Sequence, residues 1–204
     1  QGDPAGTPLP GGVDPLAFEV GAVEYSIADT AVREVDSNTL NRCIDRAARR
    51  VQSSTGELTL DYGKQLLTIN SPCAQGAVGK VGAAGSIDLK DIRIATSNAL
   101  LSLVVVSMDG LPLTQSRKML VQAVTPSRLS DARIETVTNA FTVTTASQDK
   151  SAKPSEIPAG AKLYVSGRAL PFAIDCIHAT VTFKNRAVRS ATALDLYGYA
   201  RPSE

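Results

Sequence analysis

The fold class of this chain is decided by the stretch ELTLDYGKQLLTIN, residues 57 to 70. Polar and apolar residues alternate over 57–61, and this period of two is that of a half-buried strand. Residues 61–64, DYGK, have the chemistry of a tight turn, and a second apolar run follows at 65–70. The stretch therefore predicts an antiparallel β-hairpin.

Strand-like segments continue on both sides of this hairpin. Upstream, residues 16–27 alternate in part, and downstream the turn MDGL at 108–111 contains Gly110, which can adopt a positive φ. Many short strands with scarcely any helix between them favour a mainly β fold, an antiparallel β-sandwich, over a parallel α/β sheet. The expected downstream strands are 86–89, 92–95, 100–107, 118–124, 132–137, 141–145, 162–165, 174–183 and 189–196.

One short amphipathic helix is expected near residues 37–51. Asp36 or Ser37 can cap its first turn, because a short oxygen-bearing side chain accepts hydrogen bonds from the free backbone N–H groups there. We expect the helix to pack against a sheet or to close one end of it. Its apolar face would be formed by Leu40, Ile44, Ala47 and Val51, which recur at helical spacing.

The pattern predicts a single β-sandwich domain, residues 16–204, preceded by a segment of different composition. Residues 1–15 begin QGDPAGTPLPGG and are rich in Pro and Gly, so they are interpreted as a linker, a processed terminus or an extended N-terminal arm. The segment 147–160 is polar, contains two prolines and is expected to form a long exposed loop.

Composition argues against several kinds of partner. Of the 204 residues 43% are hydrophobic, enough to form a core, and the formal net charge of +1 supplies no broad attraction for nucleic acid. No apolar stretch approaches the ~20 residues of a membrane span. Cys43, Cys73 and Cys176 match no zinc pattern, and they are interpreted either as buried apolar residues or as one disulfide with a free thiol.

No residue pattern points to a catalytic centre, a metal or a cofactor. Glu57 and Asp61 would lie roughly 13 Å apart along one strand, whereas a glycosidase needs its carboxyl groups about 5 to 10 Å apart. His178, the only histidine, lacks a nucleophile motif around it and is interpreted as structural or surface-exposed. We therefore expect no enzyme activity. Two alternatives stay open, a calcium ion held by carbonyls and an aspartate, and an unrecognised enzyme site.

Glycines recur at every third position in GAVGKVGAAG, residues 76–85. A phosphate-binding P-loop needs Gly-Lys followed by Ser or Thr, whereas Val81 follows Gly79-Lys80 here, so nucleotide binding is not expected. The series instead predicts a strand or loop whose backbone approaches another segment closely.

A resemblance to a known family is carried by three stretches: STGELTLDYGKQLLTINSPCAQGAVG at 54–79, the segment 87–124, and the segment 171–199, which ends with ALDLYGY at 193–199. They are similar to strand and turn motifs in the C-terminal accessory β-sandwich domain of bacterial glycoside hydrolases of the cellulase and agarase type. In that family the catalytic carboxylates lie in an upstream β/α barrel. The resemblance implies a secreted, extracellular, non-catalytic module whose partner is a polysaccharide or a neighbouring catalytic domain.

Candidate carbohydrate-binding residues follow from the way that sugars stack on aromatic rings. The chain has no Trp, five Tyr and four Phe. The best candidates are Tyr62 at the hairpin tip, and Asp195 with Tyr197 and Tyr199, whose rings would alternate onto one face of a strand. The competing interpretation of this tyrosine pair is a half-buried sheet edge.

A second hypothesis makes the chain a structural subunit of an extracellular assembly. Unpaired sandwich edges attract strands from other molecules. The Pro/Gly-rich N-terminal arm would then add a strand to a neighbouring copy and produce a homo-oligomer.

Overall fold

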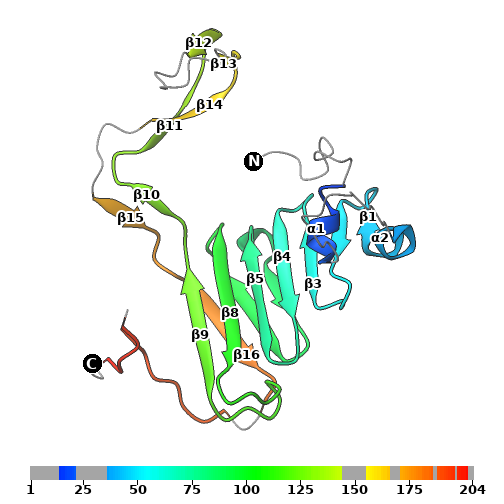
Figure 1. Ribbon diagram of the computed structural model, residues 1–204. Helices are drawn as coiled ribbons and strands as arrows, with labels where there is room; N and C mark the ends of the chain where they lie inside the picture. The colour runs from blue at the N-terminus through cyan, green and yellow to red at the C-terminus, as the bar shows by residue number, and fades with distance from the viewer. Residues whose placement is uncertain are drawn as a thin grey trace, which may run out of the picture. The chain divides into compact units, whose positions relative to one another are not determined.

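The computed structural model describes residues 14–21, 36–143, 155–165, 171–185, 188–195 and 197–201. The chain divides into two compact units, residues 1–125 with 176–204 and residues 126–175, and each is described by itself (Figure 1). Residues 1–13 of the predicted N-terminal arm lie outside the described residues. Within the described part of the chain, no helix is long and apolar enough to cross a membrane.

The first unit contains two antiparallel sheets, which confirms the predicted fold class (Figure 1). The larger sheet has seven strands in the order β1-β2-β3-β4-β5-β8-β9, and the smaller has three in the order β16-β7-β6. Their bounds are β1 Ile44–Asp45, β2 Arg50–Gln52, β3 Leu58–Asp61, β4 Leu66–Asn70, β5 Ala74–Gly79, β6 Ser86–Asp88, β7 Ile92–Thr96, β8 Leu101–Ser107, β9 Met119–Val124 and β16 Ala179–Phe183, with a short 3-10 helix at Gly82–Ala84.

The hairpin predicted at 57–70 is present as β3 and β4. Leu60 pairs with Leu67 across it, and the Asp61 carboxylate accepts a hydrogen bond of 2.8 Å from the backbone N–H of Lys64 in the turn. The predicted close backbone approach of the glycine series is also confirmed. A Cβ on Gly76 would lie 2.4 Å from the carbonyl oxygen of Leu103, so only glycine fits there.

One apolar core joins the two sheets of this unit. Ile92 and Ile94 of β7 are fully buried, and Leu103 and Val105 of β8 are at most 2% exposed in the same cluster. Burial of each such side chain contributes about 1.5 to 3 kcal/mol. A slip of one residue would turn every one of these side chains to the other face, so the core fixes the strand register.

A smaller apolar cluster holds the helices. The predicted strand 16–27 is wrong where the structure describes it, because Ala17–Val20 forms the short helix α1; residues 22–27 lie outside the described part. The Asp14 carboxylate accepts a hydrogen bond from the N–H of Leu16, and Gly21 ends the helix with φ of 79°. The buried members of the cluster are Leu16, Val20, Cys43 and Val51, with Leu40, Ile44 and Tyr62 packed against them.

The helix expected near 37–51 is shorter than predicted. Helix α2 spans Ser37–Cys43 and is capped by Asp36, whose carboxylate accepts hydrogen bonds from two backbone N–H groups, as predicted for a cap. Residues 44–52 instead form β1 and β2, in which Ile44 pairs with Val51. These β-branched residues are stabilised more by joining the sheet than by extending the helix, since Val51 is only 1% exposed there.

The second unit is a two-stranded ribbon made of nested pairs. Strand β10 (Ser127–Leu129) pairs with β15 (Phe172–Ile174), β11 (Arg133–Thr136) with β14 (Lys162–Val165), and β12 (Phe141–Val143) with β13 (Ser155–Ile157). Strand β13 lies within the segment predicted to be a loop at 147–160, where only 155–160 is described. The predicted strand 174–183 is divided between β15 and β16, which belong to different units.

Candidate functional site

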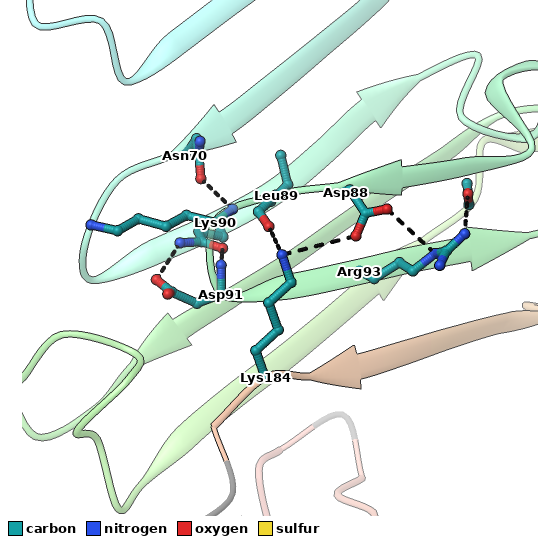
Figure 2. A network of polar contacts seen from close by, with 9 residues as sticks. Asn70, Asp88, Leu89, Lys90, Asp91, Arg93 and Lys184 are labelled. Atoms are coloured by element: carbon teal, nitrogen blue, oxygen red, sulfur yellow. Dashed lines mark hydrogen bonds and ion pairs between the residues drawn. The ribbon is translucent and has the colours of Figure 1, made fainter.

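The most connected polar cluster lies where β5 meets the turn between β6 and β7 (Figure 2). Gln75 of β5 is fully buried, and Asp91 in the turn is 6% exposed. The Gln75 amide donates to the Asp91 carboxylate at 2.6 Å and accepts from the Asp91 backbone N–H at 2.9 Å. Because β5 and β7 belong to different sheets, this two-point contact clamps the sandwich together.

Lys184, just after β16, completes the clamp (Figure 2). Its backbone N–H donates to the Asp91 carbonyl at 2.9 Å, and its ammonium donates to the Leu89 carbonyl at 2.6 Å. Asp88 lies 3.9 Å from this ammonium and 3.7 Å from the Arg93 guanidinium, and both ion pairs are solvent-exposed. No buried side-chain polar atom of the described residues lacks a hydrogen-bond partner, and the cluster holds the turn in place.

Asp109 holds the loop between β8 and β9 in place through hydrogen bonds to its carboxylate. Its carboxylate accepts from the hydroxyl groups of Ser107 and Ser116 and from the backbone N–H groups of Leu111 and Arg117, at 2.8 to 3.3 Å. The hydrogen bond from the Arg117 N–H, followed by that from the Ser116 hydroxyl, holds the pKa of Asp109 well below its usual range. The predicted turn at 108–111 is confirmed, with Gly110 at φ 73°.

The lowered pKa of Asp109 makes the loop sensitive to acid. A carboxyl whose pKa is lower in the folded than in the unfolded state stabilises the fold above the ordinary value of about 4, and this contribution is lost as pH falls through the folded-state pKa. Asp109→Asn is therefore expected to lower the urea midpoint at about pH 7 and to flatten its fall toward about pH 3. The exposed Asp88→Asn is the control, and parallel pH curves for Asp109→Asn and the parent chain would refute this role.

Asp61, one of the two carboxylates considered as a catalytic pair, is engaged in its own turn. Asp61 accepts from the N–H of Lys64 and forms an ion pair with its ammonium at 3.4 Å, as expected for a turn residue. His178 is exposed, and its backbone pairs with Thr96 and Asn98. Within the described residues no group of three His, Cys, Asp or Glu side chains could hold a metal ion.

The three cysteines are all free, so the structure holds neither of the two predicted arrangements in full. There is no disulfide among them, and only Cys43 is buried, in the α1–α2 cluster. Cys73 is half-buried and Cys176 is exposed. Their positions give no support to a shared site.

Of the predicted sugar-binding residues, Tyr62 lies apart from the other three. Its ring packs against the α1–α2 cluster, and the Arg49 guanidinium lies over it, 5.5 Å from the ring centroid. The geometry is that of a cation–π contact, which covers one face of the ring. Tyr62 therefore has a packing role that accounts for its position.

The structure brings Asp195, Tyr197 and Tyr199 together in one turn. The predicted strand 189–196 is absent over its described residues, and a single bridge between Leu194 and Ala200 closes the turn instead. One oxygen of Asp195 accepts from the N–H groups of Tyr197 and Tyr199, at 2.8 and 2.9 Å. The tyrosine side chains are 86% and 72% exposed, which contradicts a half-buried sheet edge.

A further surface was missed by the sequence analysis. Directly opposed residues of antiparallel strands lie on the same face of a sheet. Leu103 and Ala77 oppose each other in the core, so their neighbours Val104 and Gly76 lie on the other side. We call the face of β3, β4, β5, β8 and β9 opposite the core the outer face. Its residues are Leu58, Leu60, Leu67, Ile69, Ala74, Gly76, Val78, Ser102, Val104, Val106, Leu120, Gln122 and Val124.

The outer face carries no charged residue. Leu58 is 41% exposed and Val124 is 59% exposed at its two edges. On the core face of the same sheet, apolar residues do not extend as far. The core cluster contains residues of β4, β5, β8 and β9 but none of β2 or β3. There the core-facing residues are polar: Arg50, Gln52, Thr59 and Asp61.

The outer face is continuous with the surface that α1 covers. Strand pairing aligns Val124, Ser102, Val78, Leu67, Leu60 and Val51 in one row across the sheet. At the end of this row, Val51 packs with Leu16 and Val20 of the smaller cluster. One sequence signal for the outer face was available: the unbroken apolar run at 103–106 predicts a strand that is apolar on both sides.

The polar clusters described above stabilise turns and loops of the fold. Two other surfaces of the first unit expose apolar side chains instead: the outer face and the turn 194–200. Comparisons with family models, with curated proteins and with solved structures gave no significant match to this chain. Its function is therefore inferred from these two surfaces and from the sequence motifs.

Proposed function

We propose that this chain is a non-catalytic accessory module of an extracellular polysaccharide-degrading system, and that its outer face packs on a neighbouring catalytic domain. The observation that carries the proposal is the uncharged apolar outer face, on which Leu58 and Val124 are 41% and 59% exposed. Exposed contiguous apolar surface in a soluble domain marks an interaction site. The motifs at 54–79 and 193–199 suggest which kind of system the partner belongs to.

The size of the outer face favours a neighbouring domain as its occupant. Five strands about 4.8 Å apart, each contributing about five residues, give a flat footprint of roughly 300 to 400 Å². Two such surfaces bury less than the roughly 1,200 Å² of a stable complex between independent proteins. They match the lower range of contacts between domains, about 600 Å² and above. An uncharged apolar surface on the partner would fit this face without leaving a buried charge unpaired.

The polar clusters are consistent with a module that has no catalysis of its own. Gln75, Asp91 and Asp109 all use their side chains to hold turns and loops of the sandwich. Asp61 and Asp195 do the same in their own turns. These carboxylates are therefore accounted for by the fold.

The proposal is tested by placing charges on the outer face. Leu58→Lys combined with Val124→Lys is expected to lower severalfold the fluorescence of an apolar dye such as anilinonaphthalene sulfonate bound to the chain, because both ends of the apolar surface become charged. Met108→Lys is the matched control, since Met108 is 54% exposed but lies in the loop after β8. Circular dichroism checks that all variants keep their strand content.

Two results would contradict the proposal. One is dye binding that is equal in the parent chain and the doubly charged variant. The other is hydrolysis of a glycoside by the purified chain that is lost in Glu57→Gln, because the chain would then be an enzyme.

A further inference from the structure

The turn 194–200 exposes two aromatic rings to solvent. Tyr197 and Tyr199 have the highest exposed fractions, 86% and 72%, of the exposed large apolar side chains in the described residues. Burying a tyrosine ring removes much apolar surface from water, so two adjacent exposed rings forgo a substantial stabilisation. Their exposure is therefore better explained by a ligand than by the stability of the chain.

The backbone beneath these rings is held by hydrogen bonds. The Asp195 side chain accepts from both tyrosine N–H groups, and the Asp195 N–H donates to the Tyr199 carbonyl at 2.8 Å. Gly198 takes a φ of 86° between the tyrosines, and Arg201 donates its N–H to Ala193 at 2.9 Å. A surface whose backbone is already ordered loses less entropy when a ligand binds. A tyrosine adds only two side-chain torsions to that cost.

We propose that Tyr197 and Tyr199 form a sugar-stacking site, in which their rings bind the apolar faces of pyranose units in a neutral polysaccharide. This inference rests on the proposed function and names the substrate class of the system. Among the described residues of 190–201 there is one acidic and one basic side chain, Asp195 and Arg201. The two charges offset each other, and the Asp195 carboxylate is occupied by its own turn, so the surface does not select an acidic polymer.

The predicted site is thereby reduced and redefined. Asp195 orders the turn and is a positioning residue, whereas the sequence analysis assigned it to the sugar. Tyr62 is not part of this proposed site, because its ring packs against Arg49 and the α1–α2 cluster. The remaining contacts are the two ring faces, which gives a shallow site of modest affinity and broad tolerance for neutral sugars.

Affinity gel electrophoresis of the full chain tests this site, with barley β-glucan as the neutral probe and polygalacturonate as the acidic probe. The parent chain is expected to be retarded by β-glucan alone. Tyr197→Ala combined with Tyr199→Ala should weaken retardation by about tenfold or more, as expected for the loss of stacked aromatic rings. Phe172→Ala is the matched control, because Phe172 is an aromatic residue 62% exposed in the second unit.

A second variant tests the ordered backbone. Asp195→Ala keeps both rings but removes the acceptor of two hydrogen bonds, so it should weaken β-glucan binding severalfold without abolishing it. Tyrosine fluorescence reports binding directly, since the chain has no Trp. An Asp195→Ala chain that binds as tightly as the parent would remove Asp195 from its positioning role.

The inference is overturned if β-glucan does not retard the parent chain, if polygalacturonate retards it equally, or if the double tyrosine variant binds as well as the parent. The outer-face variant with Leu58→Lys and Val124→Lys should retain β-glucan binding. If the chain fails to bind β-glucan but the outer-face variant still binds less dye than the parent chain, only this inference is rejected. Equal dye binding by the parent chain and by the outer-face variant rejects the docking proposal instead.

Discussion

Gln75→Met is expected to lower the free energy of unfolding by about 3 kcal/mol, because it leaves the buried Asp91 carboxylate and N–H without their partner. Methionine is unbranched and of similar length, so the substitution removes the amide group and keeps most of the packing. Gln75 is fully buried and Asp91 is 6% exposed, so water cannot easily replace either lost hydrogen bond. Urea unfolding measured by circular dichroism gives the difference.

Asn70→Ala is the control for this clamp. The Asn70 amide oxygen also accepts a hydrogen bond at the β6–β7 turn, from the N–H of Lys90 at 3.0 Å, but it is exposed (Figure 2). Its loss should therefore cost less than about 1 kcal/mol. Equal destabilisation by Asn70→Ala and Gln75→Met would show that the buried contact between the sheets is not what holds the turn.

Gly79→Ala is expected to destabilise the first unit by roughly 3 kcal/mol, through both backbone strain and overlap. Gly79 ends β5 with φ of 112°, and a Cβ there would lie 2.1 Å from the carbonyl oxygen of Gln65. That oxygen belongs to the backbone of the β3–β4 turn and accepts a hydrogen bond from Lys80, so it cannot move away without breaking the pairing.

Gly85→Ala separates strain from overlap. Gly85 also has a positive φ, 70°, but a Cβ there meets nothing within 4 Å. With φ 70° and ψ −65°, Gly85→Ala should cost only backbone strain, on the order of 1 to 2 kcal/mol, without any overlap. If thermal unfolding gave the two variants the same loss of stability, close approach of the backbones would play no part at Gly79.

The strands were predictable from the sequence where the pattern is local. The alternation in ELTLDYGKQLLTIN and the glycine at 110 correctly indicated the β3–β4 hairpin and the turn after β8. The end of the helix was not predictable in this way, because Ile44 and Val51 fit a helical face and a strand pair equally well. Their choice depends on the neighbouring strand β3, to which Val51 pairs through Leu60.

The candidate site was predicted only in part for a similar reason. The motif ALDLYGY placed Asp195, Tyr197 and Tyr199 together, since they are close in sequence. The role of Asp195 followed only from its hydrogen bonds to the two tyrosine N–H groups. The outer face and the contact between Gln75 and Asp91 join residues that are distant in the chain, so they depend on strand order and on how the sheets stack.

Site-specific photocrosslinking tests the central claim, that the outer face docks on a catalytic domain. A photoreactive side chain placed at Val124 on the outer face is compared with one at Met108, which has a similar exposed fraction, 54% against 59%. Each photoreactive residue is introduced into the protein as the source cells produce it, and crosslinked peptides are identified by mass spectrometry. We expect crosslinks from position 124 to a glycoside hydrolase catalytic domain and none from position 108. Crosslinks that are equal from both positions, or that reach only proteins unrelated to polysaccharide degradation, would contradict the account.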